Sequence, residues 1–382
     1  MHAKLVKSIF LFGLIAAFFP GCQHRLIKQP LPQTSEQWTQ WGGNCRQTFF
    51  IKTNAALAPL KRVKTIKLSS SPGKTLLVSG KILFVSTLDG KISTFSLDTF
   101  KKLGDVRLPR KLAGTAALFQ NELIVALRFS KKSLFRLNPL TGKKRWTADL
   151  GSIETEPLIY NSRIYVTTLY KGVVAVDGDS GKIIWEKELQ TQSHSSPNLI
   201  QNDLVFGDDR GKLRALKPDS GDSLWTASLE GIIRAMPVGD EKRIYIGTTQ
   251  GNFYALDLET GKIAWKFSVN AGIFQNAAIA PEGVFLAANN GFLYKLTRDS
   301  GKLIWKQALD GVAGAPPLIF GAQILLGTLE HKLLVLDRLS GKILRSIKLK
   351  GRIRTMPIVN SDAVIAGSEE HWLYIFARGG SG

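Results

Sequence analysis

The sequence has little cysteine and little histidine. It contains two cysteines, five histidines, and no His-x-His or Cys-x-x-Cys spacing. Cys22 follows an apparent export signal and is expected to be modified, which leaves Cys45 without a partner for an internal disulfide. His331 and His371 stand in a turn column that elsewhere holds glycine, where a polar residue that tolerates positive φ is sufficient. The sequence therefore predicts neither a disulfide framework nor a metal site.

The apolar run near the N-terminus is too short to span a membrane. Ile9 to Phe19 comprises eleven residues, whereas a membrane-spanning helix needs about 20. The run follows Lys4 and Lys7, and a basic start before a short apolar core is typical of a signal peptide. We therefore expect residues 1–21 to be removed on export. The alternative is a buried N-terminal helix or strand.

The residues that end this signal suggest a lipid anchor. Phe19-Pro20-Gly21-Cys22 resembles the lipobox of bacterial lipoproteins, which implies that the Cys22 thiol is acylated. Two or more acyl chains on one residue give stable anchoring. Gln23 follows the cysteine where retention in the inner membrane would favour Asp, so the expected place is the periplasmic face of the outer membrane. Residues 22–58 are then a lipid tether and lead-in segment.

Acidic residues are scarce relative to basic ones. The chain has 51 Lys and Arg against 30 Asp and Glu, a formal net charge of +21. Twelve of the basic residues lie between Lys101 and Asp149. In a cytosolic protein such a cluster suggests nucleic acid, but an exported protein meets anionic lipid headgroups instead. We expect no nucleic-acid partner and leave two readings of the cluster open, membrane-surface binding and an ordinary solvated rim.

The rest of the chain repeats with a period of forty residues. Turn glycines recur at intervals of 39 or 40, and a tryptophan or, once, an arginine stands four residues after each. A second column of proline, with one alanine, has the same spacing. The glycines are Gly142, Gly181, Gly221, Gly261, Gly301 and Gly341, followed by Trp146, Trp185, Trp225, Trp265, Trp305 and Arg345; the second column is Pro157, Pro197, Pro237, Ala277, Pro317 and Pro357.

Each repeat has the content of one propeller blade. Short β-branched and aromatic runs alternate with glycine-containing turns, and four short strands in about 40 residues form a blade. A leucine column extends back to Leu108 and Leu68, which gives eight blades. Residues 64–68 match residues 345–349, so the N-terminal strand is expected to complete the last blade. The prediction is an all-β, eight-bladed propeller of four-stranded antiparallel blades over residues 59–377, with a flexible tail at 378–382.

These repeats resemble a known family. Asp257 to Trp265 and its copies are similar to the repeat of pyrroloquinoline-quinone-type propellers, and nearly the whole mature chain is similar to the BamB-type lipoproteins of the outer-membrane barrel-assembly machinery. The resemblance implies a non-enzymatic scaffold whose partners are barrel-assembly proteins and unfolded β-barrel clients. The loops that bear partner contacts in that family, with Leu, Arg and Asp, differ here: 190–196 is short and holds neither Leu nor Arg, and 230–236 carries Arg234 but no Asp. No contact residue is therefore carried over.

Two other functions remain as alternatives. One is a ligand- or polyanion-binding envelope lipoprotein that uses the channel mouth as its pocket. The other is a quinone-dependent dehydrogenase, which would need the quinone, a Ca²⁺ held by oxygen ligands and usually a vicinal disulfide. The sequence contains no Cys-Cys pair, and its tryptophans recur once per repeat as packing requires. We therefore predict no enzymatic activity, no catalytic residues and no cofactor.

One column varies in chemistry while its neighbours repeat. Three residues before the proline column stand Gly114, Glu154, His194, Arg234, Phe274, Gly314 and Arg354. These positions precede the innermost strands, so they are expected to ring the mouth of the central channel. Positions freed from packing are where a propeller expresses specificity. We predict partner or ligand binding by Glu154, His194, Arg234 and Arg354. The alternative is that they are solvated loop residues.

Overall fold

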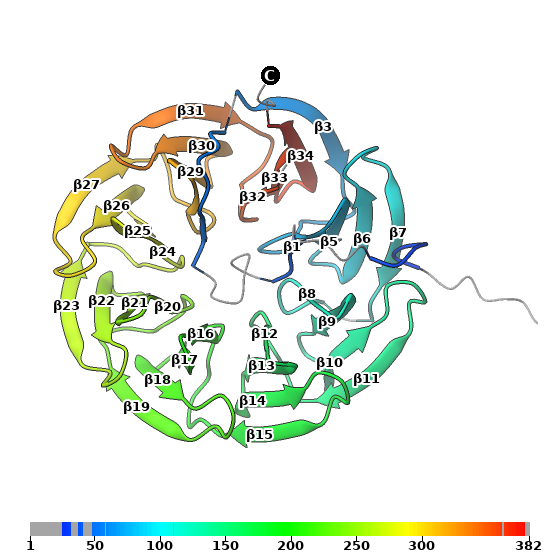
Figure 1. Ribbon diagram of the computed structural model, residues 1–382, viewed down its shortest axis with the longest axis horizontal. Coiled ribbons are helices and arrows are strands. Elements are labelled where there is room, and N and C mark those ends of the chain that lie inside the picture. The colour runs from blue at the N-terminus through cyan, green and yellow to red at the C-terminus, as the bar shows by residue number, and fades with distance from the viewer. Residues whose placement is uncertain are drawn as a thin grey trace, which may run out of the picture.

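The protein is described by a computed structural model that covers residues 25–31, 37–40, 48–57, 59–109, 111–360 and 363–378. Within these residues every regular element is a β strand, and the strands form eight sheets arranged as a ring of blades (Figure 1). The predicted all-β, eight-bladed propeller is confirmed. The signal peptide at 1–21, Cys22, Cys45 and residues 379–382 lie outside the described residues.

Blades 1 to 4 each have four strands in chain order from the channel outward. Blade 1 consists of β4 (Leu77–Ser79), β5 (Ile82–Ser86), β6 (Lys91–Ser96) and β7 (Lys102–Arg107). Blade 2 consists of β8 (Ala117–Phe119), β9 (Glu122–Ala126), β10 (Lys132–Leu137) and β11 (Lys144–Asp149). Blade 3 consists of β12 (Leu158–Tyr160), β13 (Arg163–Thr168), β14 (Gly172–Asp177) and β15 (Ile183–Lys187). Blade 4 consists of β16 (Asn198–Ile200), β17 (Asp203–Gly207), β18 (Lys212–Leu216) and β19 (Ser223–Ser228).

Blades 5 to 8 continue the ring. Blade 5 consists of β20 (Val238–Gly239), β21 (Arg243–Gly247), β22 (Asn252–Asp257) and β23 (Ile263–Ser268). Blade 6 consists of β24 (Ala278–Ala280), β25 (Gly283–Ala288), β26 (Phe292–Leu296) and β27 (Leu303–Ala308). Blade 7 consists of β28 (Leu318–Phe320), β29 (Gln323–Gly327), β30 (Lys332–Asp337) and β31 (Ile343–Lys348). Blade 8 consists of β32 (Ile358–Val359), β33 (Ala363–Ser368), β34 (Trp372–Ala377) and β3 (Lys61–Lys67).

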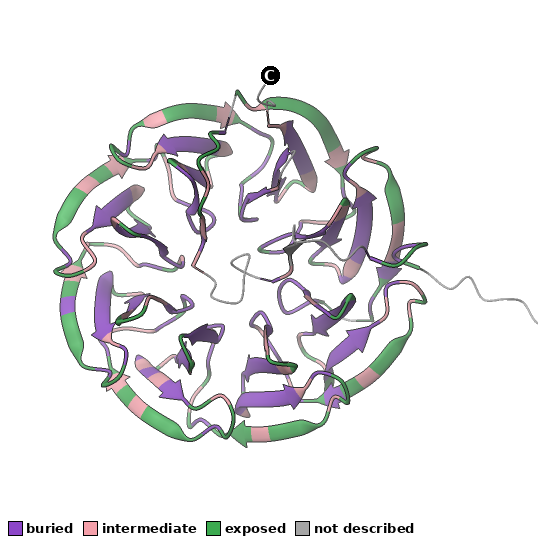
Figure 2. Ribbon diagram, viewed as in Figure 1, coloured by how far each residue is buried: buried purple, intermediate pink, exposed green. Residues whose placement is uncertain are grey.

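The strands of a blade differ in burial according to their distance from the axis. Middle strands such as β25 are buried throughout, whereas outer strands such as β27 alternate between exposed and half-buried residues (Figure 2). A middle strand is covered on both faces by the neighbouring blades and is therefore apolar at successive positions, while an outer strand faces solvent on one side. The core of the molecule is thus the set of surfaces between blades.

Tryptophan and glycine of successive repeats meet at the seams between blades. A Cβ placed on Gly261 would lie 2.4 Å from Trp225 Cε3, so the indole of blade 4 packs directly on the turn of blade 5. The Trp225 indole N–H also donates to the Leu258 carbonyl of that turn at 2.8 Å. The same packing recurs between Trp146 and Gly181, Trp185 and Gly221, Trp265 and Gly301, and Trp305 and Gly341. The tryptophan and glycine columns of the sequence are therefore the two sides of one packing contact between neighbouring blades.

The ring is closed by a strand from the beginning of the chain. The β3 strand pairs antiparallel with β34, with Lys61 opposite Ala377 and Lys67 opposite Trp372. This confirms the predicted closure, which pairs two edges that would otherwise be free to aggregate. Closure also explains why Arg345 replaces tryptophan in blade 7. In blade 8 the turn that would receive an indole is replaced by the two ends of the chain.

A segment near the N-terminus fills the seam between blades 1 and 2. Gly104 of β7 stands at the tryptophan position of blade 1, and a Cβ there would lie 2.1 Å from the Arg25 carbonyl oxygen. The backbone N–H groups of Leu26 and Ile27 donate to the Pro139 carbonyl at 2.9 and 3.1 Å. Pro139 corresponds to the residue that accepts the indole hydrogen bond in later blades. Leu26 and Ile27 are buried here in place of the missing ring.

The lead-in segment adds two short strands to the inner side of the ring. The β1 strand (Gln37–Trp38) pairs antiparallel with β4, and β2 (Phe50–Ile51) pairs parallel with β28. Between them, the Thr39 carbonyl accepts from the Leu118 amide, and the Thr48 carbonyl accepts from the Ile279 amide. The described lead-in residues therefore satisfy backbone groups of innermost strands in several blades. No helix among the described residues is long and apolar enough to cross a membrane.

Candidate functional site

The mouth residues project from connections that are fixed by buried neighbours. Ile233 precedes Arg234 and is fully buried, and its Cγ2 lies 2.1 Å from where a Cβ on Gly207 would stand. Ile353 is buried in the same way before Arg354. Because a buried isoleucine anchors the connection, the next side chain points away from the seam. The column therefore surrounds one end of the channel, as its place before the innermost strands predicts.

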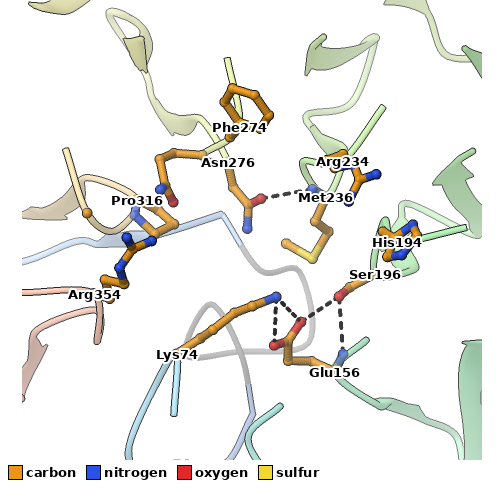
Figure 3. Close-up of a pocket in the computed structure, with 12 residues that line it drawn as sticks. Lys74, Glu156, His194, Ser196, Arg234, Met236, Phe274, Asn276, Pro316 and Arg354 are labelled. Atoms are coloured by element: carbon orange, nitrogen blue, oxygen red, sulfur yellow. Dashed lines mark hydrogen bonds and ion pairs between the residues drawn. The ribbon is translucent and has the colours of Figure 1, made fainter. Parts of the chain in front are cut away.

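A cavity of about 220 Å³ lies at this mouth (Figure 3). Its lining comes from blade 1 and blades 3 to 8. The lining residues are Lys74, Glu156, His194, Ser196, Arg234, Met236, Phe274, Gln275, Asn276, Gly314, Pro316 and Arg354. Three of the four predicted binding residues are in this set. The fourth, Glu154, is not part of the lining but contacts His194.

A buried carboxylate forms the polar floor of the cavity. The side chain of Glu156 is 3% exposed, and the Lys74 ammonium lies 3.1 Å from its Oε1 and 3.4 Å from its Oε2. The Ser196 hydroxyl donates to Oε2 at 2.6 Å. Among the described residues, Oε1 has no partner other than the Lys74 ammonium. Its neighbour Gly114 leaves the space that this carboxylate fills, since a Cβ there would lie 2.5 Å from Oε1.

His194 lies between two carboxylates. Its Nδ1 is 2.9 Å from Asp209 Oδ2, and its Nε2 is 3.7 Å from Glu154 Oε2. Asp209 Oδ2 is also 3.5 Å from the Arg234 guanidinium, and Glu154 Oε2 is 3.7 Å from that of Arg128. The mouth of blades 2 to 5 is therefore a chain of alternating basic and acidic side chains. Such a chain holds its side chains in place while leaving Arg234 about 40% exposed.

Arg354 belongs to a separate cluster on the other side of the cavity. Its Nε lies 2.5 Å from Glu369 Oε1, and the Arg352 guanidinium is 4.0 Å from Glu369 Oε2. The structure therefore brings Glu154, His194 and Arg234 together and leaves Arg354 apart from them, with the cavity between.

Sequence reasoning missed the residues of the cavity floor. Lys74 belongs to the same column as His194, counted back to the first blade. Glu156, Ser196 and Asn276 belong to a column two residues further on, directly before the prolines. The corresponding residue is apolar in the other blades. The three polar residues in this column could therefore have indicated the cavity floor. Asn276 accepts a hydrogen bond from the Met236 amide at 2.8 Å, which links blade 6 to blade 5.

Exposed apolar side chains stand on the same face of the ring. Phe129 and Tyr170 are 69% and 70% exposed at the tips of the turns between the second and third strands of blades 2 and 3. Asp209, which contacts His194, lies in the corresponding turn of blade 4. The Phe129 amide donates to the Ser152 hydroxyl at 3.1 Å, and Phe129 has a φ of +51°. A bulky residue held exposed with positive φ is uncommon.

The charged side chains of the mouth are largely paired with one another. Among the described residues no three His, Cys, Asp or Glu side chains are grouped so that they could hold a metal ion. The mouth carboxylates face basic partners, and Ser196 hydrogen-bonds to a carboxylate that is itself paired with Lys74. What remains accessible is a set of guanidinium and ammonium groups beside two aromatic rings. This set can bind polar or acidic groups and apolar side chains of a partner.

Comparison with known proteins identifies relatives of the chain. The family described as "Outer membrane protein assembly factor BamB" matches residues 79–235 and 209–382. No curated protein sequence matches. Among solved structures, BamB from Moraxella catarrhalis is 18% identical with a TM-score of 0.70, and the match covers 83% of this chain and 99% of that one.

Proteins with other activities share the fold. The computationally designed Ika8 protein is 15% identical with a TM-score of 0.74, covering 83% of this chain and 99% of that one. Quinohemoprotein alcohol dehydrogenase from Comamonas testosteroni is 14% identical with a TM-score of 0.75, covering 91% of this chain and 81% of that one. Likeness at this level of identity concerns the fold alone.

Proposed function

The chain belongs to the family of the outer membrane protein assembly factor BamB, and from this premise we propose that it is a non-enzymatic scaffold lipoprotein. It supports the assembly and insertion of β-barrel proteins at the periplasmic face of the outer membrane. Its partners are proteins of the barrel-assembly machinery and unfolded β-barrel clients, and the acylated Cys22 anchors it. Function sits in sites grafted on folds, so the contact surface has to be argued from residues.

The mouth face carries this proposal. Phe129 and Tyr170 expose most of their side chains on the same face of the ring as the Arg234 guanidinium, which is about 40% exposed. Aromatic residues and arginine dominate the binding energy of protein interfaces. We assign Glu154, His194, Arg234 and Arg354 to the polar part of this contact surface. The ion pairs at His194 and Arg354 hold these side chains in place, which lowers the entropy lost on binding.

The absence of catalysis is part of the same proposal. The likeness to the quinohemoprotein alcohol dehydrogenase, at 14% identity, concerns the fold and carries no activity over to this chain. The described mouth offers paired charges, and Ser196, the serine that lines its cavity, donates to a carboxylate. Binding partners through turn tips and connections requires none of the cofactor chemistry of those enzymes.

The test is complementation in cells that lack the native copy. A Phe129→Ala/Tyr170→Ala variant is expected to lower the amount of folded β-barrel protein in the outer membrane. The matched control is Leu339→Ala/Leu344→Ala, which removes two exposed apolar side chains, 64% and 51% exposed, from blade 7. The control is expected to restore assembly fully. Normal barrel assembly in cells without any copy would show that the proposed function is wrong.

One observation favours a second function, the binding of a small ligand. Glu156 Oε1 is buried at the floor of the 220 Å³ cavity, and its one described partner is the Lys74 ammonium at 3.1 Å. A carboxylate oxygen can accept more than one hydrogen bond, so a donor on a ligand would find a place there. Native mass spectrometry of protein purified from envelopes tests this. An added mass that disappears in Glu156→Gln supports a ligand, and quinone absorbance in the pure protein would support the dehydrogenase alternative.

A further inference from the structure

Part of the outer rim is far more basic than the remainder. The outer strands of blades 8, 1 and 2, with the residues that lead into them, carry ten basic and two acidic residues over 61–67, 101–107 and 143–149. The basic residues are Lys61, Arg62, Lys64, Lys67, Lys101, Lys102, Arg107, Lys143, Lys144 and Arg145. These three blades are consecutive in the ring (Figure 1), so the charges form one continuous arc. We call this arc the basic rim.

Several charges of the basic rim have no acidic neighbour. Lys61, Arg62, Lys64, Lys101 and Lys143 are all exposed. Within the described part of the chain, none of the five forms an ion pair. Because these five side chains do not already contact acidic side chains, all of them can bind anionic groups at the same time. The charged side chains of the mouth differ in this respect, since they are paired with one another.

The N-terminal segment reaches the same arc. Leu26 and Ile27 are fixed between β7 of blade 1 and Pro139 of blade 2 by hydrogen bonds and burial. Figure 1 shows this segment at the outside of the ring, beside β7. Cys22 precedes Arg25 by three residues, and three residues span at most about 11 Å when fully extended. An acyl chain on Cys22 would therefore enter the membrane next to the basic rim.

We propose that the basic rim is a docking surface for an anionic lipid bilayer, which the propeller meets edge-on. Lipid headgroups attract basic residues near a membrane surface, and the attraction falls off within a Debye length of about 8–10 Å. A short link to the lipid anchor keeps the rim within that range. Edge-on docking leaves the channel mouth, with Phe129 and Tyr170, at right angles to the bilayer and open to partners.

The anchor in this inference rests on the proposed function, whereas the lipid-binding surface does not. An acidic protein is the competing occupant of the basic rim. The bilayer is favoured because the covalent link that the sequence indicates, at Cys22, is only three residues along the chain from Arg25, which lies beside β7 of the rim. The test below uses neither an acyl chain nor barrel-assembly proteins. Its failure is therefore distinguishable from a failure of the scaffold proposal.

The first experiment measures vesicle binding by the chain from residue 23 onward, which keeps every described residue. The vesicles contain phosphatidylcholine and phosphatidylglycerol in equal amounts, with pure phosphatidylcholine as reference. Replacing Lys61, Arg62, Lys64, Lys101 and Lys143 by glutamine is expected to weaken binding at least about tenfold, since each basic residue near the surface contributes roughly fivefold.

The matched control removes five exposed lysines from blades 3 to 6. They are Lys182, Lys217, Lys262, Lys302 and Lys306. Both variants change the net charge by the same amount, so the control is expected to lose less than about threefold. Equal losses in both variants would mean that net charge alone drives binding, and an unchanged basic-rim variant would assign the rim to another partner. Either result overturns the proposal.

The second experiment tests the orientation directly. An environment-sensitive fluorophore is attached at Thr147→Cys on β11 or at Thr226→Cys on β19, both in a Cys45→Ser background. The two threonines are exposed and each follows a seam tryptophan, so their local settings match. Vesicles are expected to shift the emission at position 147 and leave position 226 unchanged. A shift at position 226 alone, or at both positions equally, contradicts edge-on docking on this arc.

Discussion

Six of the eight seams of the ring are closed in one of two ways. From blade 2 to blade 7 each seam contains a tryptophan that packs on the turn glycine of the next blade. Between blades 1 and 2 the tryptophan position is Gly104, and the backbone of Arg25 to Ile27 occupies the space instead. Both arrangements place apolar bulk and an N–H donor against the same turn. At these six seams the same two features are therefore supplied by different parts of the chain.

The largest effect is expected from removing a tryptophan. Trp265 is 9% exposed, its indole donates to the Arg298 carbonyl at 2.9 Å, and its ring lies 5.9 Å from that of Tyr245. Trp265→Ala is expected to lower the free energy of unfolding by about 3–5 kcal/mol. Trp265→Phe keeps most of the bulk and is expected to lose about 1 kcal/mol for the hydrogen bond. Urea denaturation measures both, and equal losses would refute the separation of bulk from donor.

A somewhat smaller effect is expected at the seam closed by the N-terminal segment. Leu26 is fully buried, so Leu26→Ala is expected to cost about 2–4 kcal/mol. The exposed Leu339 provides the control, since Leu339→Ala removes the same atoms from a site that is 64% exposed. The melting temperatures of the two variants provide the measurement. If Leu26→Ala lowers the melting temperature no more than Leu339→Ala does, the N-terminal segment does not contribute to the stability of the seam.

The turn glycines sharpen the comparison further. Gly261 has a φ of +67°, and a Cβ there would lie 2.4 Å from Trp225. Gly151 has a φ of +73° with nothing within 4 Å of its Cβ position. Gly151→Ala is therefore expected to cost about 1–2 kcal/mol for backbone strain alone, and Gly261→Ala about 2–4 kcal/mol because it also displaces the indole. Chemical denaturation of the two variants should show this difference.

The smallest effect is expected from an ion pair that links two blades. Asp240 of blade 5 pairs with Arg298 of blade 6 at 2.6 Å. Burial alone would raise the pKa of Asp240, but hydrogen bonds from the Lys242 amide, Arg298 and Tyr245 outweigh it and hold the pKa below its ordinary value. A lowered folded-state pKa stabilises the protein above the unfolded-state pKa, and this contribution is lost as the pH falls through the folded-state value.

Asp240→Asn tests this electrostatic contribution. At about pH 7 the variant is expected to be less stable than the native chain by about 1–3 kcal/mol. The difference should shrink as the pH falls from about 4 through the lower folded-state pKa, because the unfolded chain then binds a proton that the folded carboxylate does not. Melting temperatures of both proteins across this range provide the measurement. A difference that stays constant with pH would show that the charge of Asp240 is irrelevant.

The repeated parts of the fold could be predicted, and the unrepeated parts could not. Trp225 and Gly261 follow a fixed spacing because every blade needs the same contact, and the match of residues 64–68 to 345–349 predicts ring closure. Residues 25–27 and the β1 and β2 strands have no copies elsewhere in the chain. Where these segments pack depends on the missing tryptophan of blade 1. That gap in the repeat is recognised only when Gly104 is aligned with the tryptophan positions of the other blades.

The candidate site shows the same division. The variable column predicts a ring at the mouth, and His194, Arg234 and Arg354 line the cavity there. The pairing of Lys74 with Glu156 could not be predicted, because it joins blades 1 and 3 across the blade between them. Spacing along the sequence describes neighbours within a repeat. It does not describe which side chains of distant repeats are long enough to meet over the channel.

The central claim is that this propeller is a scaffold in barrel assembly. It is tested most directly by mild cross-linking in native envelopes, purification of the protein in detergent and mass spectrometry of what accompanies it. We expect the barrel-assembly protein and its companion lipoproteins to dominate, and to be depleted in the Phe129→Ala/Tyr170→Ala variant. Recovery of the propeller alone, or with anionic glycans in place of those proteins, would contradict the claim and restrict the likeness to BamB to the fold.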